Sequence, residues 1–227
     1  LVMEPSDLAA AADRGVTRGR HAQTDCFARM ALSAPVTLTR PDDMLSRRQA
    51  RRALGIGRGP HCLISLGGDE TGERHLLMHN LQEAAAKARV RLYVASSPLT
   101  TPEPNLIGMT RTQTVHVYPL APFLAAFDGI VTAAGYNSFH EVLQLSDRPV
   151  LFAPGRGARR DDQAARAGFA AEQSWAYCLD DERPIHETVA TFMADVRAGA
   201  SVTSRPAWRD GAGEIANALC ALIDCEG

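Results

Sequence analysis

The feature that most constrains this 227-residue chain is a regular alternation of short apolar runs with longer segments of helical periodicity. The runs have the length of buried strands and lie at residues 61–66, 90–95, 114–118, 129–133, 149–153 and 175–179. Helical patterns separate or follow them at residues 72–88, 119–127, 137–145, 162–171, 184–198 and 211–224. This alternation predicts a parallel sheet with helices on both faces, a Rossmann-like three-layer α/β sandwich.

The first forty residues do not share this pattern. Residues 7–29 are rich in Ala, Arg and Gly, residues 35–40 look strand-like, and a helical stretch at residues 44–54 is stopped by Gly55. We therefore interpret residues 1–40 as the end of a preceding domain or a linker, and residues 41–227 as a compact domain. Because the chain starts with Leu1 rather than Met, we expect an upstream part of the protein.

Composition excludes several classes of function. The formal net charge of -2 gives no electrostatic reason to expect nucleic acid as a partner. No apolar stretch approaches the roughly 18 residues of a membrane span, and the N-terminus does not resemble a signal peptide. The five cysteines form no CxxC pair, which predicts neither disulfides nor a zinc site and favours a cytoplasmic location.

The sequence contains two basic clusters. The first, at Arg47, Arg48, Arg51 and Arg52, is interpreted as the solvated face of a helix. The second, at Arg156, Arg159 and Arg160, is interpreted as a solvated loop, with contacts to a diphosphate or an anionic acceptor as the alternative.

A glycine pair, Gly67 and Gly68, directly follows the first predicted strand of the compact domain. Glycines at this point allow a ligand to approach the backbone, and the next helix presents free N–H groups to an anion. The segment is neither GxGxxG nor a P-loop, so a tight strand-to-helix turn explains it equally well.

A richer segment spans residues 118–163. Gly135 follows a strand and permits a tight loop, and Asn137 or Ser138 can cap the next helix, whose amides would face a diphosphate. Glu141 falls one turn later, where a carboxylate can accept two hydrogen bonds from a ribose diol. After the next strand come Asp162 and Gln163, which suit sugar hydroxyls.

At these residues the segment resembles the donor-binding signature of UDP-sugar glycosyltransferases. Plant enzymes of this kind carry W-x-P-Q, then H-C-G-W-N-S-x-x-E, then D-Q, and the bacterial N-acetylglucosaminyltransferases of peptidoglycan-precursor synthesis carry R-A-G-A-x-T-x-x-E. The resemblance covers residues 41–224 and implies the C-terminal, donor-binding half of a GT-B fold. It assigns nucleotide contacts to Gly67, Gly68, Tyr118, Leu120, Gly135, Tyr136, Asn137, Ser138 and Glu141, and sugar contacts to Asp162 and Gln163.

The sequence departs from this signature at two positions. Ala133 replaces the plant histidine, and Leu120 replaces the glutamine near the base. Base recognition would then depend on backbone groups near Tyr118, so UDP is expected as the donor nucleotide without a side chain that specifies it.

The resemblance further implies an inverting transfer of a hexose or N-acetylhexosamine from a UDP-sugar, with no cofactor and no metal. The general base belongs to an N-terminal acceptor domain, supplied by a longer chain or by a separate subunit, so this chain alone should not transfer sugar. A peripheral membrane association through the acceptor stays open.

The same residues allow other interpretations. Tyr136 could simply pack, and His140 is expected to be structural or exposed. At the level of function, a nucleotide-sugar hydrolase or epimerase of the same architecture is the main alternative, followed by a non-catalytic binding module.

Overall fold

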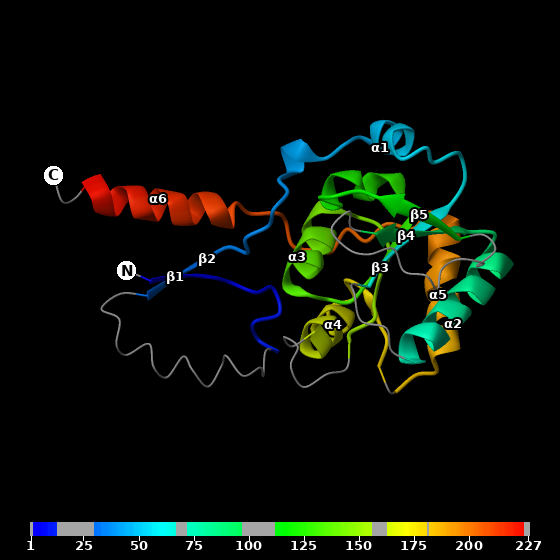
Figure 1. Ribbon diagram of the computed structural model, residues 1–227. Helices are drawn as coiled ribbons and strands as arrows, with labels where there is room; N and C mark the ends of the chain where they lie inside the picture. Colours follow the sequence, from blue (N-terminus) through cyan, green and yellow to red (C-terminus); the bar gives the residue numbers. More distant parts are fainter. Residues whose placement is uncertain are drawn as a thin grey trace.

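The computed structural model describes residues 2–12, 30–66, 72–96, 112–155, 163–180 and 182–224 (Figure 1). Its centre is a six-stranded sheet in the order β5-β4-β3-β6-β7-β8, in which all neighbouring strands are parallel. The strands are β3 His61–Ser65, β4 Arg91–Ser96, β5 Thr112–His116, β6 Gly129–Thr132, β7 Val150–Phe152 and β8 Tyr177–Cys178. The predicted Rossmann-like α/β fold is confirmed.

Helices cover both faces of this sheet (Figure 1). On one face lie α2 Gly72–Ala88 and α5 Ile185–Ala198, and on the other α1 Arg47–Ala53, the 3-10 helix η4 Ala121–Ala126, α3 Tyr136–Leu145 and α4 Gln163–Glu172. Side chains alternate between the two layers along each strand: Cys62 and Ile64 pack on the α2 side, whereas Leu63 packs on the α3 side. The central strands β3, β6 and β7 are therefore buried on both faces, as their sequence predicted, whereas the edge strand β5 is mostly polar and exposed.

The order of the strands determines where a ligand can bind. From β3 the chain builds β4 and β5 on one side, returns to the centre as β6, and then builds β7 and β8 on the other side. Ligands of such sheets bind at the carboxyl ends of the strands, where this reversal occurs. Ser65 and Thr132, the last residues of β3 and β6, are paired with each other. The segment that follows Thr132 thus lies at the switch point.

Two further strands lie within the first forty residues and were not predicted. They are β1 Val2–Pro5 and β2 Met30–Ser33, which form a separate two-stranded parallel sheet, whereas residues 35–40 contain no strand. Helix α6 Gly211–Asp224 packs beside β2. The backbone N–H of Ala34 donates to Glu214 Oε2 at 2.7 Å, and a Cβ on Gly211 would lie only 2.1 Å from the Ala34 carbonyl oxygen.

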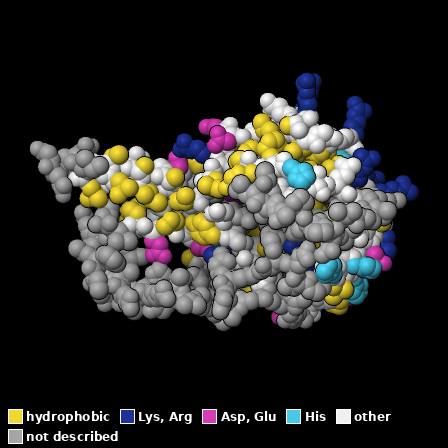
Figure 2. Space-filling view, viewed as in Figure 1, with side chains coloured by type: hydrophobic (Ala, Val, Ile, Leu, Met, Phe, Trp, Pro, Cys, Tyr) yellow, Lys and Arg dark blue, Asp and Glu magenta, His cyan; other side chains and the backbone are white. Residues whose placement is uncertain are grey.

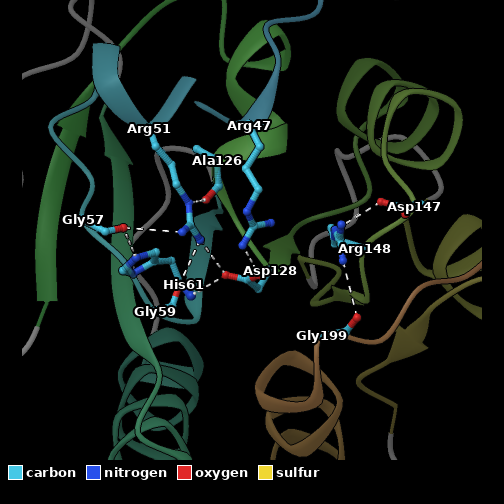
Figure 3. A network of polar contacts seen from close by, with 10 residues as sticks. All are labelled: Arg47, Arg51, Gly57, Gly59, His61, Ala126, Asp128, Asp147, Arg148 and Gly199. Carbon is cyan, nitrogen blue, oxygen red and sulfur yellow. Dashed lines mark hydrogen bonds and ion pairs between the residues drawn. The ribbon is translucent and has the colours of Figure 1, made fainter. Parts of the chain in front are cut away.

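The helix predicted at residues 44–54 is shorter in the structure. A 3-10 helix, η2 Pro41–Asp43, precedes α1, which begins at a capping box between Ser46 and Gln49. Arg48 and Arg52 are exposed, as predicted for a solvated face. Arg47 and Arg51 are not: one turn apart, both turn inward and pair with Asp128 (Figure 3). The prediction was wrong for these two because a buried carboxylate lies under that side of α1.

Within the described residues, none of the helices combines the length and apolar character needed to cross a bilayer. Cys62 is fully buried and Cys178 is half-buried.

Candidate functional site

Helix α3 begins at the switch point of the sheet. Its first residue is Tyr136 and its N-cap is Gly135, whose φ of -61° and ψ of 153° are open to any residue. The prediction that Asn137 or Ser138 caps the helix was wrong, because both already lie within its first turn and Gly135 takes the cap position without a side-chain bond. The first intrahelical bond runs from Phe139 N to Gly135 O at 2.8 Å.

This geometry leaves the amides of the first turn available. Hydrogen bonds of an α-helix start at the fourth residue after the cap, so the N–H groups of residues 136–138 have no carbonyl partner within α3. The positive end of the helix dipole coincides with them. We call residues 135–138 the α3 start. With Asn137 exposed and Ser138 half-buried, it is suited to hold an anionic group such as a diphosphate.

Gln163 reaches the α3 start from the neighbouring helix. It is the first residue of α4, and its Oε1 accepts a hydrogen bond from Gly155 N at 3.0 Å. Its Nε2 would lie 3.9 Å from a Cβ added to Gly135. The structure therefore brings together two predicted residues that are distant in sequence. Three other predicted residues, Gly67, Gly68 and Asp162, lie outside the described residues, as do Arg156, Arg159 and Arg160.

Glu141 lies one helical turn beyond the α3 start and is half-buried. Burial raises the pKa of its carboxyl group, while hydrogen bonding to the backbone of Leu38 and Thr39 lowers it. The Oε1 atom is buried and has no hydrogen-bond partner among the described residues, and the same is true of Thr132 Oγ1 at the end of β6. Buried polar atoms without a partner are rare in folded proteins and call for an explanation. A hydroxyl-bearing ligand that reached Oε1 would satisfy Glu141.

The predicted base-binding residues have different environments. Tyr118 is 62% exposed and can offer its ring to a flat ligand, whereas Leu120 is partly buried against the core. Leu120 directly precedes η4, which contacts α3. The side chain of Leu120 thus belongs to the packing that holds η4 in place.

Sequence reasoning did not find a polar cluster beneath the α3 start. Asp7 Oδ2 accepts a hydrogen bond from Arg166 Nε at 2.6 Å, and Asp7 Oδ1 lies 3.3 Å from Nε2 of the fully buried His140. Burial raises the pKa of Asp7, but hydrogen bonding to His140 and Arg166 outweighs this and lowers it to about 2. The Arg166 guanidinium lies 5.7 Å from the centre of the Tyr136 ring. We call Asp7, Tyr136, His140 and Arg166 the Asp7 cluster.

Only one signal for this cluster was available in the sequence. Tyr136 and His140 are four residues apart and so share one face of α3. His140 was expected to be structural or exposed, and its full burial shows that it is structural. Nothing in the sequence pattern links Asp7 to α3 or α4, because its contacts are with residues far along the chain. Arg166, for example, lies 159 positions after Asp7.

Comparison with known proteins relates the fold to solved structures. No protein-family model matches the sequence, and no curated protein matches it. The calicheamicin glycosyltransferase is similar with a TM-score of 0.53 and 14% identity, over 89% of this chain and 51% of that one. A Medicago truncatula glycosyltransferase complexed with UDP-glucose is similar with a TM-score of 0.51 and 14% identity, over 83% of this chain and 45% of that one. This chain has the fold of one half of a GT-B enzyme.

The chain spans about half the length of these two proteins. The α3 start and Gln163 lie at the switch-point edge of the sheet, which is the ligand-binding edge of Rossmann-like folds, whereas Glu141 lies one turn further along α3 against residues 38–39. Across the described residues, no group of three or more His, Cys, Asp or Glu side chains is arranged to hold a metal ion.

Proposed function

We propose that this chain is the nucleotide-sugar-binding half of an inverting, metal-independent glycosyltransferase that uses a UDP-linked hexose or N-acetylhexosamine. One observation carries the proposal: a helix whose first amides have no carbonyl partner within it starts at the switch point of a GT-B half-fold, with Gln163 beside this start and Glu141 one turn beyond. The structural similarity to a plant enzyme complexed with UDP-glucose supports this class of donor.

Each part of the donor has a matching group. The diphosphate lies over the α3 start, where amides and the helix dipole stabilise the negative charge that develops as the nucleotide leaves. The ribose diol donates to the carboxylate of Glu141, whose Oε1 lacks a partner among the described residues. The amide of Gln163 reaches the sugar hydroxyls. The exposed ring of Tyr118 offers a surface for the base.

A second domain is needed for transfer, and one surface suits its docking. The parallel pair β1–β2 stands apart from the main sheet, although parallel sheets usually have both faces covered. Exposed apolar side chains lie on β2 and on the adjacent α6: Leu32 is 67% exposed, Leu219 49% and Leu222 39%. Figure 2 shows hydrophobic side chains gathered along α6 and β2. We propose that an acceptor-binding domain, in the same polypeptide or in a separate subunit, covers this surface and supplies the general base.

Calorimetric titration tests the donor site directly. UDP, dTDP, GDP and ADP are titrated into the wild-type chain, with UDP expected to bind most tightly. Glu141→Ala removes the carboxylate that accepts from the diol, and we expect a loss of about 1.5–3 kcal/mol, about tenfold to a hundredfold in affinity. Glu187→Ala, an exposed glutamate on α5, is the matched control and should bind like the wild type. Equal affinities for both variants would refute the assignment of Glu141.

Product analysis tests the reaction. The chain is incubated with UDP-glucose or UDP-N-acetylglucosamine, alone and with a separately produced acceptor domain. Transfer is expected only when that domain is present. Transfer by the 227 residues alone would show that the base lies in this chain. Free sugar or an epimer formed without an acceptor would instead support a nucleotide-sugar hydrolase or epimerase.

A further inference from the structure

The α3 start is held from below by a segment near the N-terminus. Residues 6–9 contact α3 and α4 through Asp7 and Leu8. Ala9 is 1% exposed and belongs to the core that α3 helps to build. Ser6 N also donates to Ser33 O at 3.1 Å, which ties the same segment to the end of β2. One short stretch therefore connects the β1–β2 pair to the helix of the proposed donor site.

Tyr136 fixes the first turn of α3 to this segment. Its hydroxyl donates to Ser6 O at 2.9 Å and accepts from Val36 N at 3.4 Å. Its backbone carbonyl pairs with His140 Nδ1 at 2.7 Å, and the two rings lie 4.2 Å apart. Because a carbonyl oxygen can only accept, Nδ1 of His140 carries the proton in this contact.

His140 and Arg166 complete the connection from the other side. The Nε2 atom of His140 lies 3.1 Å from Leu8 N and 3.3 Å from Asp7 Oδ1. The carboxylate of Asp7 also accepts from Ala9 N at 2.8 Å. The side chains of Asp7 and Arg166 are only 14% and 12% exposed, so solvent screens this ion pair weakly.

We propose that the Asp7 cluster positions the donor site: by anchoring residues 6–9 to Tyr136, His140 and Arg166, it fixes the α3 start in the orientation that receives the diphosphate. Asp7, His140 and Arg166 are positioning residues that act through α3 and do not touch the ligand. A site held in this way binds its ligand more tightly, because the protein loses less conformational freedom on binding. This inference rests on the proposed nucleotide site for its functional consequence, but not for the anchoring itself.

The test combines nucleotide affinity with local amide exchange. Asp7→Asn keeps the size of the side chain and an acceptor for Ala9 N but removes the charge that faces Arg166 and His140. Tyr177→Phe is the control, because it removes another side-chain hydrogen bond, from Tyr177 to Asp195 at 2.6 Å, on strand β8 and away from α3. Both variants are compared with the wild type by UDP titration, and by hydrogen exchange of amides in α3 and in α5.

We expect Asp7→Asn to weaken UDP binding by roughly twofold to thirtyfold, and to speed exchange in α3 but not in α5. Tyr177→Phe should leave both the affinity and the exchange of α3 as in the wild type. Arg166→Gln should resemble Asp7→Asn, and the double variant should be little worse than either single one, because all three break the same contact. Unchanged affinity and unchanged α3 exchange in Asp7→Asn would overturn the proposal.

The two hypotheses fail in different ways. If the wild type binds none of the nucleoside diphosphates, the proposed function is wrong, and the exchange of α3 amides still decides whether Asp7 anchors the helix. If the wild type binds UDP and Asp7→Asn binds it equally well, the donor site stands and the positioning role of Asp7 is refuted.

Discussion

Arg51 and Asp128 form an ion pair, with Nη2 and Oδ2 3.0 Å apart, at the edge of the sheet opposite the α3 start. Asp128 directly precedes β6, and its carboxylate also pairs with Arg47 and accepts from the backbone N–H of His61 at 2.9 Å (Figure 3). Arg51 in turn donates to Ala126 O at 2.9 Å. A single carboxylate thus ties α1 to the first residues of β3 and to the segment that precedes β6.

Asp128→Ala should destabilise the fold without affecting nucleotide binding. The side chain of Asp128 is 9% exposed, and its loss leaves the partly buried guanidinium of Arg51 without its counter-ion and the amide of His61 without its acceptor. We expect a decrease of about 3 kcal/mol in the free energy of unfolding, measured in urea. Asp147→Ala, whose carboxylate is 55% exposed in a pair with Arg148, should cost at most about 1 kcal/mol. Similar costs for both variants would contradict the role given to Asp128.

Gly129→Ala should also destabilise, through a different cause. A Cβ at this first position of β6 would lie 2.3 Å from Val196 Cγ2 and 3.1 Å from Phe192 on α5. Forcing these layers apart should cost about 1–3 kcal/mol in urea denaturation. The matched control is Gly168→Ala in α4, where a Cβ meets nothing within 4 Å. There alanine should stabilise by about 0.5–1 kcal/mol, and a loss of stability would show that packing around α4 is tighter than described.

The sequence predicted the main sheet because its signal is local. The helix predicted at residues 72–88 coincides with α2 Gly72–Ala88, and the run at residues 149–153 contains β7 Val150–Phe152. Buried strands and amphipathic helices carry their pattern within a few residues. Strands β1 and β2 have no such signal, because each is only four residues long, VMEP and MALS, which is too short for a distinctive pattern.

In the candidate site too, residues with a local sequence signal were predicted, whereas long-range contacts were not. Glycine and glutamine at the right spacing identified Gly135 and Gln163, which the structure brings together. The inward turn of Arg51 could not be predicted, since it depends on a carboxylate 77 residues away. The contacts of Asp7 with His140 and Arg166 could not be predicted for the same reason. Long-range polar pairs leave no periodic pattern in a single sequence.

Gly135→Ala separates a functional glycine from a structural one. A Cβ at Gly135 would meet only Gln163 Nε2, at 3.9 Å, and the φ of -61° suits alanine. Stability in urea should therefore change by no more than about 0.5 kcal/mol. A methyl group at the helix start would nevertheless stand between the diphosphate and the amides. We expect UDP affinity to fall by about tenfold, equal to about 1.4 kcal/mol.

The matched control for this experiment is Gly57→Ala, since a Cβ at Gly57 meets nothing within 4 Å and Gly57 is exposed near the opposite end of β3. It should leave both stability and UDP affinity unchanged. If Gly135→Ala binds UDP as tightly as Gly57→Ala does, the diphosphate does not lie over the α3 start.

The Asp7 cluster should also show itself in the pH dependence of stability. The pKa of Asp7 is lowered from 3.8 to about 2 in the folded chain, so the folded state favours the ionised carboxylate. The stability that Asp7 contributes is therefore fully present above pH 4 and is lost as the pH falls from about 4 to about 2. The difference in urea midpoint between wild type and Asp7→Asn should be constant at neutral pH and shrink over this acid range. The difference between wild type and Gly168→Ala, a variant without a titrating group, should stay constant over the same range. A difference for Asp7→Asn that does not change with pH would show that the carboxylate of Asp7 gains nothing from Arg166 and His140 in the folded chain.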